Sequence, residues 1–366
     1  MNAMTISSAL NYLDNDLIVS SSIIKKTIKS KRKPVLVAAV AAVCIAVCSC
    51  AIVLMRGFEK EPEAFSLGIN EDGGMGFEGW FFSDISQAEN GNPWNEKAKI
   101  KNLPVYENNI YDENGYACAL NEDEQLNRLK AAADILGAEI NENDISYVSG
   151  IYGNDEKNYS VAVYAPFENG TIISNAGGMV TVNFDSKTEL TDEQISALAK
   201  HFLGSSDINQ ATLQSCNVYG EVSYEQRYFI GKNKTEKIIS YNLRYITVKT
   251  DAENKTWIMI TDNLIKENKI GMYPVISPEE AEELLLDGHF ITSQIQYDFP
   301  GEEYIVKSEL VYRCGRNEAT APYYLFYVEL PEAPSENGLK SYGAYYVPAI
   351  KAEYVTDFPL YDGIFQ

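Results

Sequence analysis

The stretch NEDEQLNRLKAAADILG, residues 121–137, sets the architecture predicted for most of the chain. Asn121 and Glu124 have the spacing of a capping box, in which each side chain bonds the other residue's backbone N–H at a helix start. The apolar residues that follow share one helical face: Leu126, Leu129, Ala133 and Leu136. Because Gly137 comes directly after this pattern, the stretch predicts a capped helix that ends there.

Two further stretches repeat the pattern. TDEQISALAKHFLG, residues 191–204, begins with Thr191 and Gln194 at capping-box spacing. SPEEAEELLLDG, residues 277–288, does the same with Ser277 and Glu280, and it has a proline in the first helical turn. Both stretches end in glycine, so they predict two more capped helices.

Strand-like runs lie between and after these helices. They are SVAVYAPF, GMVTVNFD, EKIISYNLRYITVKTD, KTWIMITD, SELVYRC, YYLFYVEL and GAYYVPAI. In the third run, residues 236–251, Tyr241, Leu243 and Tyr245 would share one strand face. A helix followed by about three antiparallel strands, repeated, predicts an α+β ectodomain in which helices pack on sheet faces. We expect α+β units over 104–270 and a C-terminal α+β unit over 271–366.

A separate stretch, Val35–Met55, predicts that the chain crosses a membrane. Its 21 uncharged residues span ~31 Å as a helix, close to the ~30 Å core of a bilayer. A secretory signal has a shorter apolar run and a shorter preceding segment, so we expect an uncleaved transmembrane helix over 34–56. A lipid-modified cysteine after Val47 is the alternative, but the apolar run continues beyond Cys50.

Basic residues set the orientation of this span. Arg56 and Lys60 follow it, and six residues precede it: Lys25, Lys26, Lys29, Lys31, Arg32 and Lys33. The bias predicts a single-pass cell-membrane protein with a cytoplasmic N-terminus and an extracellular C-terminal domain. Small residues recur every fourth position in the span, at Ala38, Ala42, Ala46 and Cys50, so a homodimer through this helix is a further interpretation.

Composition limits the partners. Residues 1–60 hold 8 of the 30 Lys and Arg and 3 of the 52 Asp and Glu, which leaves 22 and 49 beyond Lys60, a net charge of −27. Such a surface repels nucleic acids, so we expect no nucleic-acid partner, and it suits cationic partners or simple solubility. Of the cysteines outside the span, Cys118, Cys216 and Cys314, at most two can pair.

The inner segment, residues 1–33, is short and amphipathic. Leu10, Leu13 and Leu17 fall on one helical face. Such a segment cannot bury its apolar face alone, so it should lie on the lipid bilayer or bind a cytoplasmic partner.

The segment after the span, residues 57–103, combines glycine and acidic residues with aromatic residues. A pure linker is poor in aromatic residues, so we expect a juxtamembrane arm whose rings pack on the folded domain. The candidate partner-binding residues here are Glu78, Trp80, Asp84 and Trp94. Glu78 and Asp84 beside Trp80 could also act as the carboxylate pair of a cell-wall hydrolase, although a solvated acidic arm is the preferred interpretation.

Motifs for catalysis or cofactors are weak. Gly74, Gly76 and Gly79 satisfy G-x-G-x-x-G, but an acidic stretch stands where a dinucleotide site needs a buried strand. His201 and His289 suit packing or turn positions, and neither H-E-x-x-H nor G-x-S-x-G occurs. We therefore expect no catalytic residues, no cofactor and no metal.

Four motifs carry a family resemblance: ALNYLDNDLI (9–18), GMGFEGWFFSDIS (74–86), NGNPW (90–94) and NLPVYENN (102–109). In this order they resemble a group of single-pass membrane proteins of clostridial and related gut Firmicutes, some of them regarded as anti-sigma-like. The resemblance implies that residues 1–33 hold a sigma factor while the outer domain senses. The final third is more loosely similar to extracytoplasmic regulators of the YycH/YycI type and to PepSY-like modules, which act by binding.

Together these features predict a single-pass, membrane-anchored extracytoplasmic protein of a Gram-positive bacterium that binds or regulates rather than catalyses. Its partners would be the bilayer, a cytoplasmic regulator such as a sigma factor, and an envelope peptide or protein. The main alternative is a purely anchored envelope-binding or structural module, and a cell-wall hydrolase is the third interpretation.

Overall fold

The computed structural model describes residues 62–69, 78–112, 116–150, 159–217, 219–294, 296–313, 315, 318–333, 338–361 and 363. These residues form fifteen β-strands in three antiparallel sheets, of eight, five and two strands, and four α-helices. The predicted α+β fold class is therefore wrong, because the described chain is mostly antiparallel β-sheet. Capped helices carry strong local signals, whereas the pairing of strands depends on residues far apart in the sequence.

The eight-stranded sheet combines two consecutive runs of four strands, in the order β3-β4-β5-β6-β10-β9-β8-β7. Its strands are β3 (Ser146–Gly150), β4 (Tyr159–Phe167), β5 (Gly170–Asn175), β6 (Val180–Phe184), β7 (Ile208–Cys216), β8 (Val222–Ile230), β9 (Arg244–Thr250) and β10 (Thr256–Asp262). At the centre β6 pairs with β10, where Val182 lies opposite Ile258 and both are fully buried. This one pairing merges the two runs into one sheet.

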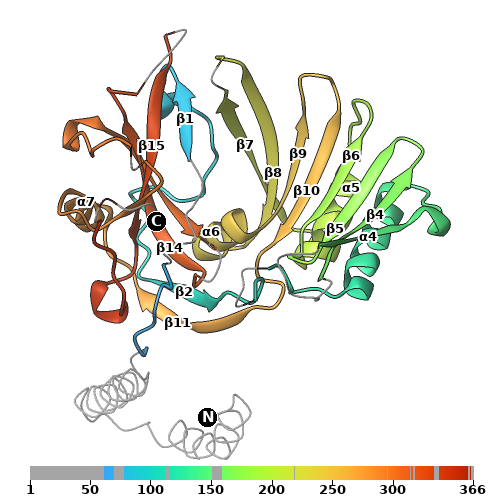
Figure 1. Cartoon of the computed structure of the whole chain (residues 1–366), viewed down its shortest axis with the longest axis horizontal. Helices are drawn as coiled ribbons and strands as arrows, with labels where there is room; N and C mark the ends of the chain where they lie inside the picture. The colour runs from blue at the N-terminus through green and yellow to red at the C-terminus, as the bar shows by residue number, and fades with distance from the viewer. Residues whose placement is uncertain are drawn as a thin grey trace, which may run out of the picture. The chain divides into compact units, whose positions relative to one another are not determined.

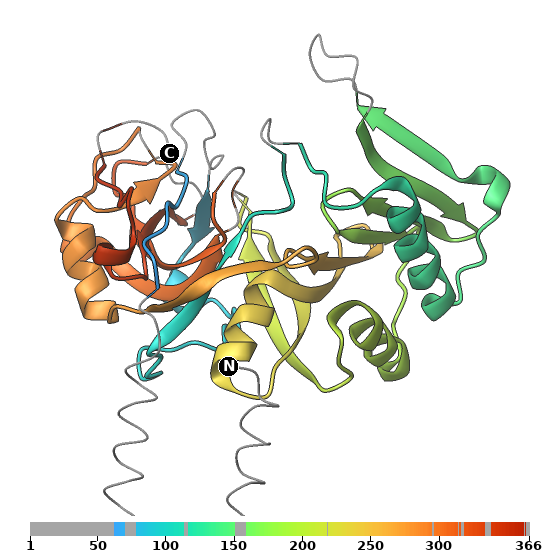
Figure 2. The same cartoon turned by 90° about the horizontal axis from the view of Figure 1, so that it is seen from below.

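Helices α4 (Glu122–Leu136) and α5 (Asp192–Leu198) lie on the same face of this sheet (Figures 1 and 2). Leu129 of α4 and Leu198 of α5 are fully buried in one cluster with Ile258. A π-helical turn, η3 (Ala199–Leu203), continues α5. Helices were expected to pack on sheet faces, and these two helices share one face of one sheet.

The three predicted helix starts are confirmed, each by a complete capping box. The pairs are Asn121 with Glu124, Thr191 with Gln194, and Ser277 with Glu280, the last at the start of α7 (Pro278–Leu286). The predicted stops at Gly137 and Gly204 are confirmed, and both glycines adopt the left-handed conformation, whereas α7 ends at Leu286, two residues before the predicted stop at Gly288. The shorter helical turns are η1 (Ile85–Gln87), η2 (Glu142–Asp144), η4 (Glu302–Tyr304) and η5 (Ala352–Tyr354).

The long strand expected over 236–251 is wrong in its first half. Residues Lys234–Leu243 form helix α6, which the Asn233 side chain caps, and β9 begins only at Arg244. Tyr241 therefore lies on a helix, where it packs against Phe229 of β8. The apolar residues of this run fit both the helical period of 3.6 residues and the strand period of two. Here tertiary packing selects the helix. Residues 251–255 join β9 to β10 in an antiparallel hairpin.

The five-stranded sheet contains β1 (Gly79–Phe82), β12 (Ile291–Thr292), β13 (Ile305–Arg313), β14 (Ala321–Glu329) and β15 (Lys340–Pro348). Its order is β1-β15-β14-β13, with β12 also on β15. β1 comes from the expected juxtamembrane arm, and its Trp80 lies opposite Tyr342. The third sheet, β2 (Asn102–Glu107) with β11 (Asn268–Pro274), crosses the base of the view in Figure 1.

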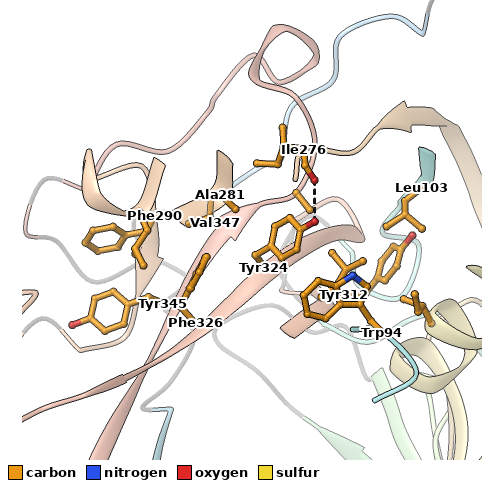
Figure 3. Close-up of a cluster of buried hydrophobic side chains, with 14 of the residues drawn as sticks. Trp94, Leu103, Ile276, Ala281, Phe290, Tyr312, Tyr324, Phe326, Tyr345 and Val347 are labelled. Carbon is orange, nitrogen blue, oxygen red and sulfur yellow. Dashed lines mark hydrogen bonds between the residues drawn. The ribbon is translucent and has the colours of Figure 1, made fainter. Parts of the chain in front are cut away.

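Both faces of the five-stranded sheet are buried. One face presents Tyr324, Phe326 and Tyr345 to a core that includes α7 residues (Figure 3). The opposite face presents Tyr323 and Tyr346 to a second core. The tyrosine-rich runs are thus interior strands of a sheet, as their β-propensity predicts.

Three expectations fall outside the described residues: the inner segment 1–33, the span 34–56 and the pairing of Cys314. Among the described residues, none of the helices has the length and apolar character needed to cross a bilayer. Cys118 and Cys216 are free thiols. Residues 62–366 group as one compact unit.

Candidate functional site

The candidate residues Glu78 and Trp80 lie at β1, against the five-stranded sheet. The Glu78 N–H donates to Ser293 Oγ at 2.9 Å, and a Glu78 carboxylate oxygen accepts a hydrogen bond from the Tyr346 hydroxyl. The Trp80 ring lies 4.7 Å from the Tyr327 ring, centroid to centroid. Both residues therefore hold the N-terminal arm to β14 and β15.

Asp84 and Trp94 also have structural roles. Asp84 caps η1 and accepts hydrogen bonds from the Ser86 backbone and hydroxyl. These bonds, the side-chain bond first, lower the pKa of the Asp84 carboxyl. Trp94 is buried and lies edge-on to Tyr324 at 5.6 Å (Figure 3). Leu10, Leu13 and Leu17 fall outside the described residues.

The spacing of Glu78 and Asp84 does not suit a hydrolase pair. The four residues of β1 stand between them, which at ~3.3 Å per residue separates their backbones by more than ~13 Å. Glycosidase carboxyl groups lie about 5 to 9.5 Å apart. Each carboxylate also accepts a hydrogen bond from another group, Glu78 from Tyr346 and Asp84 from Ser86, so the structure does not bring the two together as an acid and a base.

A cavity of about 450 Å³ lies between α6, the start of β9 and the turn after β10. We call it the Arg244 cavity. It is lined by Tyr106, Gly204, Ser205, Asp207, Ile230, Gly231, Lys232, Glu236, Ile239, Ser240, Arg244, Leu264 and Glu267. Its volume is within the range of small-molecule sites, and its lining is mixed, with apolar walls and a few charged groups.

The backbone around Arg244 is fixed by α6. The Ser240 hydroxyl accepts a hydrogen bond from the Ile230 N–H at 2.9 Å and donates to the Arg244 carbonyl at 2.7 Å. Because Arg244 directly follows Leu243, the last residue of α6, its side chain starts from a rigid junction between helix and strand. Such a junction can hold a binding group in one orientation.

A buried carboxylate orients the Arg244 side chain. Asp262, at the end of β10, forms an ion pair with Arg244, in which an Asp262 carboxylate oxygen lies 3.0 Å from Arg244 Nε, and the Asp262 side chain is only 6% exposed. Burial raises the pKa of the Asp262 carboxyl, while Arg244 and then Arg128 oppose that rise. Asp262 therefore interacts with two guanidinium groups, one from β9 and one from α4.

The cluster holds more positive than negative charge. Arg128 donates to the Gly178 carbonyl at 2.8 Å and stacks over Phe202 at 5.0 Å, but its Nε is buried without a partner among the described residues. The two terminal nitrogens of Arg244 make no hydrogen bond within the described parts of the chain. Two guanidinium groups thus face one carboxylate, and Arg244 lines the cavity.

The rim of the Arg244 cavity is mainly acidic. Asp207 and Glu267 are exposed, and Glu236 accepts hydrogen bonds from the Lys232 N–H and the Asn233 amide. Tyr106 forms part of the buried wall, where burial raises its pKa to about 12 and keeps the hydroxyl neutral. The cavity therefore offers a ligand the Arg244 guanidinium, the neutral Tyr106 hydroxyl and carboxylate hydrogen-bond acceptors at the rim.

Sequence reasoning missed this site because it placed Arg244 in the middle of a long strand. Arg244 and Asp262 lie opposite each other across the β9–β10 hairpin, whereas Arg128 is distant in the sequence and comes near them only through the packing of α4 on the sheet. One local signal was available, since Arg244 interrupts the apolar stretch NLRYITV and Asp262 ends the apolar stretch WIMITD. Charges inside such runs are costly unless they are paired.

The described residues contain no group of three or more His, Cys, Asp or Glu placed to hold a metal ion. Comparison of the chain with protein-family models, curated proteins and solved structures gives no match.

Proposed function

We propose that the chain is a membrane-anchored extracytoplasmic binding protein that takes the carboxylate of an envelope peptide into the Arg244 cavity. The uncharged segment 34–56 would supply the anchor, and the residues after Lys60 would face outward. The described candidate residues at β1 and η1 have structural contacts, so the proposal rests on the cavity instead.

The main support for this proposal is the Arg244 guanidinium, whose positive charge is only partly balanced by Asp262. Asp262 holds its Nε, which leaves the two terminal nitrogens as unused donors at the cavity wall. A guanidinium presents a planar fork that matches the two oxygens of a carboxylate. A bound carboxylate would also balance the positive charge of the Arg128–Asp262–Arg244 cluster.

The rim favours a peptide over a phosphate or another polyanion. Asp207, Glu236 and Glu267 would repel additional negative charge, whereas they can accept hydrogen bonds from N–H groups. A ligand with one carboxylate and several N–H donors satisfies both parts of the lining. Peptides have this combination.

The proposal also includes a regulatory role for the inner segment. In it, residues 1–33 bind a cytoplasmic regulator such as a sigma factor, through Leu10, Leu13 and Leu17. Replacing all three leucines with serine should abolish co-purification of that regulator. The anchored-module alternative predicts unchanged cytoplasmic partners.

Binding can be tested with the full chain in detergent micelles. We expect acetyl-alanyl-alanine with a free carboxylate to bind, and its C-terminal amide to bind much more weakly, by isothermal titration calorimetry. Arg244→Gln should weaken the carboxylate form tenfold or more, since a charge-assisted hydrogen bond contributes about 1.5 to 3 kcal/mol.

Arg227→Gln is the matched control. Arg227 is also a largely buried arginine that pairs with a carboxylate, Glu225 at 3.3 Å, and stacks on Tyr245, but it does not line the Arg244 cavity. Equal affinity for the carboxylate and the amide, or equal losses in both variants, would contradict the proposal.

A further inference from the structure

A second, smaller cavity lies beside the end of β14, with a volume of about 240 Å³. We call it the Tyr297–Tyr304 pocket. Its lining residues are Tyr297, Asp298, Pro300, Tyr304, Leu330, Pro331 and Glu332. None of them lines the Arg244 cavity. Since small-molecule sites usually measure about 300 to 1,000 Å³, this pocket fits a single side chain or a small ion.

The pocket is built on the core of the five-stranded sheet. Leu330, only 4% exposed, belongs to that core. Phe299 fixes the loop between the two tyrosines, because its ring lies 5.5 Å from the Tyr345 ring. The Tyr304 N–H donates to the Gly301 carbonyl at 3.2 Å, where Gly301 has a φ of +124° that favours glycine. The tyrosines are therefore positioned before any ligand binds.

The charge of the pocket is entirely negative. Asp298 and Glu332 are exposed, and neither forms an ion pair or a side-chain hydrogen bond with the described residues. No lysine, arginine or histidine is among its lining residues. Two carboxylates, two aromatic rings and two prolines thus surround a space that has an apolar floor.

We propose that the Tyr297–Tyr304 pocket binds the cationic end of one arginine or lysine side chain on a partner peptide. An organic cation gains from aromatic faces and from nearby carboxylates at the same time. A metal ion would find only two carboxylates beside proline and leucine, too few oxygen ligands for calcium or magnesium. The net charge of −27 after Lys60 would attract such a peptide from a distance.

The test uses the full chain in detergent micelles and isothermal titration calorimetry with arginine amide. Citrulline amide has nearly the same shape without the charge, so it is the matched ligand control. We expect arginine amide to bind and citrulline amide to bind at least tenfold more weakly. Lysine amide should bind within about tenfold of arginine amide, since an ammonium also interacts with aromatic rings.

Two variants locate the binding. Asp298→Asn removes one charge from an exposed side chain and should weaken arginine amide about fivefold to tenfold, and Tyr304→Ala should weaken it further. Asp287→Asn and Tyr219→Ala change exposed residues outside the pocket and should leave the affinity unchanged. Arg244→Gln should also have no effect, which separates this proposal from the peptide-carboxylate site.

Three results would overturn the proposal. They are no binding of arginine amide, equal binding of citrulline amide, and an affinity that Asp298→Asn leaves unchanged. The last result retains its meaning even if Tyr304→Ala fails to fold, because Asp298 is exposed and its replacement has nearly the same size.

Discussion

Individual residues of the NGNPW stretch, residues 90–94, make contacts that require their particular side chains. Gly91 adopts a φ of +59°, and a Cβ added there would lie 2.4 Å from the Ala211 Cβ of β7. Asn92 donates to the Leu310 carbonyl of β13 at 3.2 Å, and the Tyr241 hydroxyl of α6 donates to the Asn90 carbonyl. The stretch therefore links both large sheets and α6, and only glycine fits at its second position.

Replacing Gly91 with alanine should destabilise the protein more than the same change at Gly137. At Gly137 the φ is +71° and nothing lies within 4 Å of an added Cβ. Gly137→Ala should therefore lower the free energy of unfolding by about 1 to 2 kcal/mol, through backbone strain alone. Gly91→Ala adds overpacking against Ala211, for a total of roughly 3 kcal/mol. Urea unfolding of both variants in detergent micelles measures the difference, and equal losses would contradict the close approach to β7.

Among the elements, α4 shows how a local signal and a distant contact combine. Its first turn carries Glu122, Asp123 and Glu124, which suits the positive end of a helix dipole. The Asn121 backbone N–H, followed by Lys266, lowers the pKa of the Glu124 carboxyl. The capping box was predictable from four consecutive residues, but the Lys266 contact, at 3.1 Å, required the fold.

The charge of Glu124 should stabilise α4 at neutral pH but not in strong acid. Since its pKa is lower in the folded than in the unfolded chain, its contribution is present above about 4.5 and is lost as the pH falls through the lowered value. Glu124→Gln should therefore cost less than about 1 kcal/mol at pH 7 and nothing near pH 2. Urea unfolding at the two pH values tests this, with the exposed Glu139→Gln beyond the helix end as the control.

At the scale of the whole molecule, the pairing of β6 with β10 creates the eight-stranded sheet. Thr181 lies opposite Met259, and Met259 lies opposite Thr247 of β9. The β9–β10 hairpin places Asp262 opposite Arg244, and Arg128 of α4 lies near both. The Arg244 cavity is thus lined by several elements of the fold and not by any one motif.

A disulfide can test this sheet order. Opposed residues in an antiparallel pair have Cα atoms about 4.5 to 5.5 Å apart, within the range for disulfides. Thr181→Cys with Met259→Cys should therefore cross-link on oxidation, as detected by mass spectrometry of the cleaved chain. Thr181→Cys with Ile258→Cys is the control, because neighbouring strand residues point to opposite faces. Efficient cross-linking of the control pair would contradict the register.

The sequence by itself determined the features that depend on neighbouring residues. Three helix starts, the glycine stops at Gly137 and Gly204, and seven of the fifteen strands in the described residues follow from capping spacing and apolar period, which act over a few residues. The net charge of the chain after Lys60 likewise needs no structure.

Only the tertiary structure decided the sheet order, the helix α6 and both cavities. Strand pairing joins residues that are distant in the chain, and the run at 236–251 fits a helix or a strand until Tyr241 packs on Phe229. Arg244 looked like one strand residue among others in the sequence. It became a candidate binding residue because folding places it beside Asp262, near Arg128 and at a cavity, where its charge is only partly balanced.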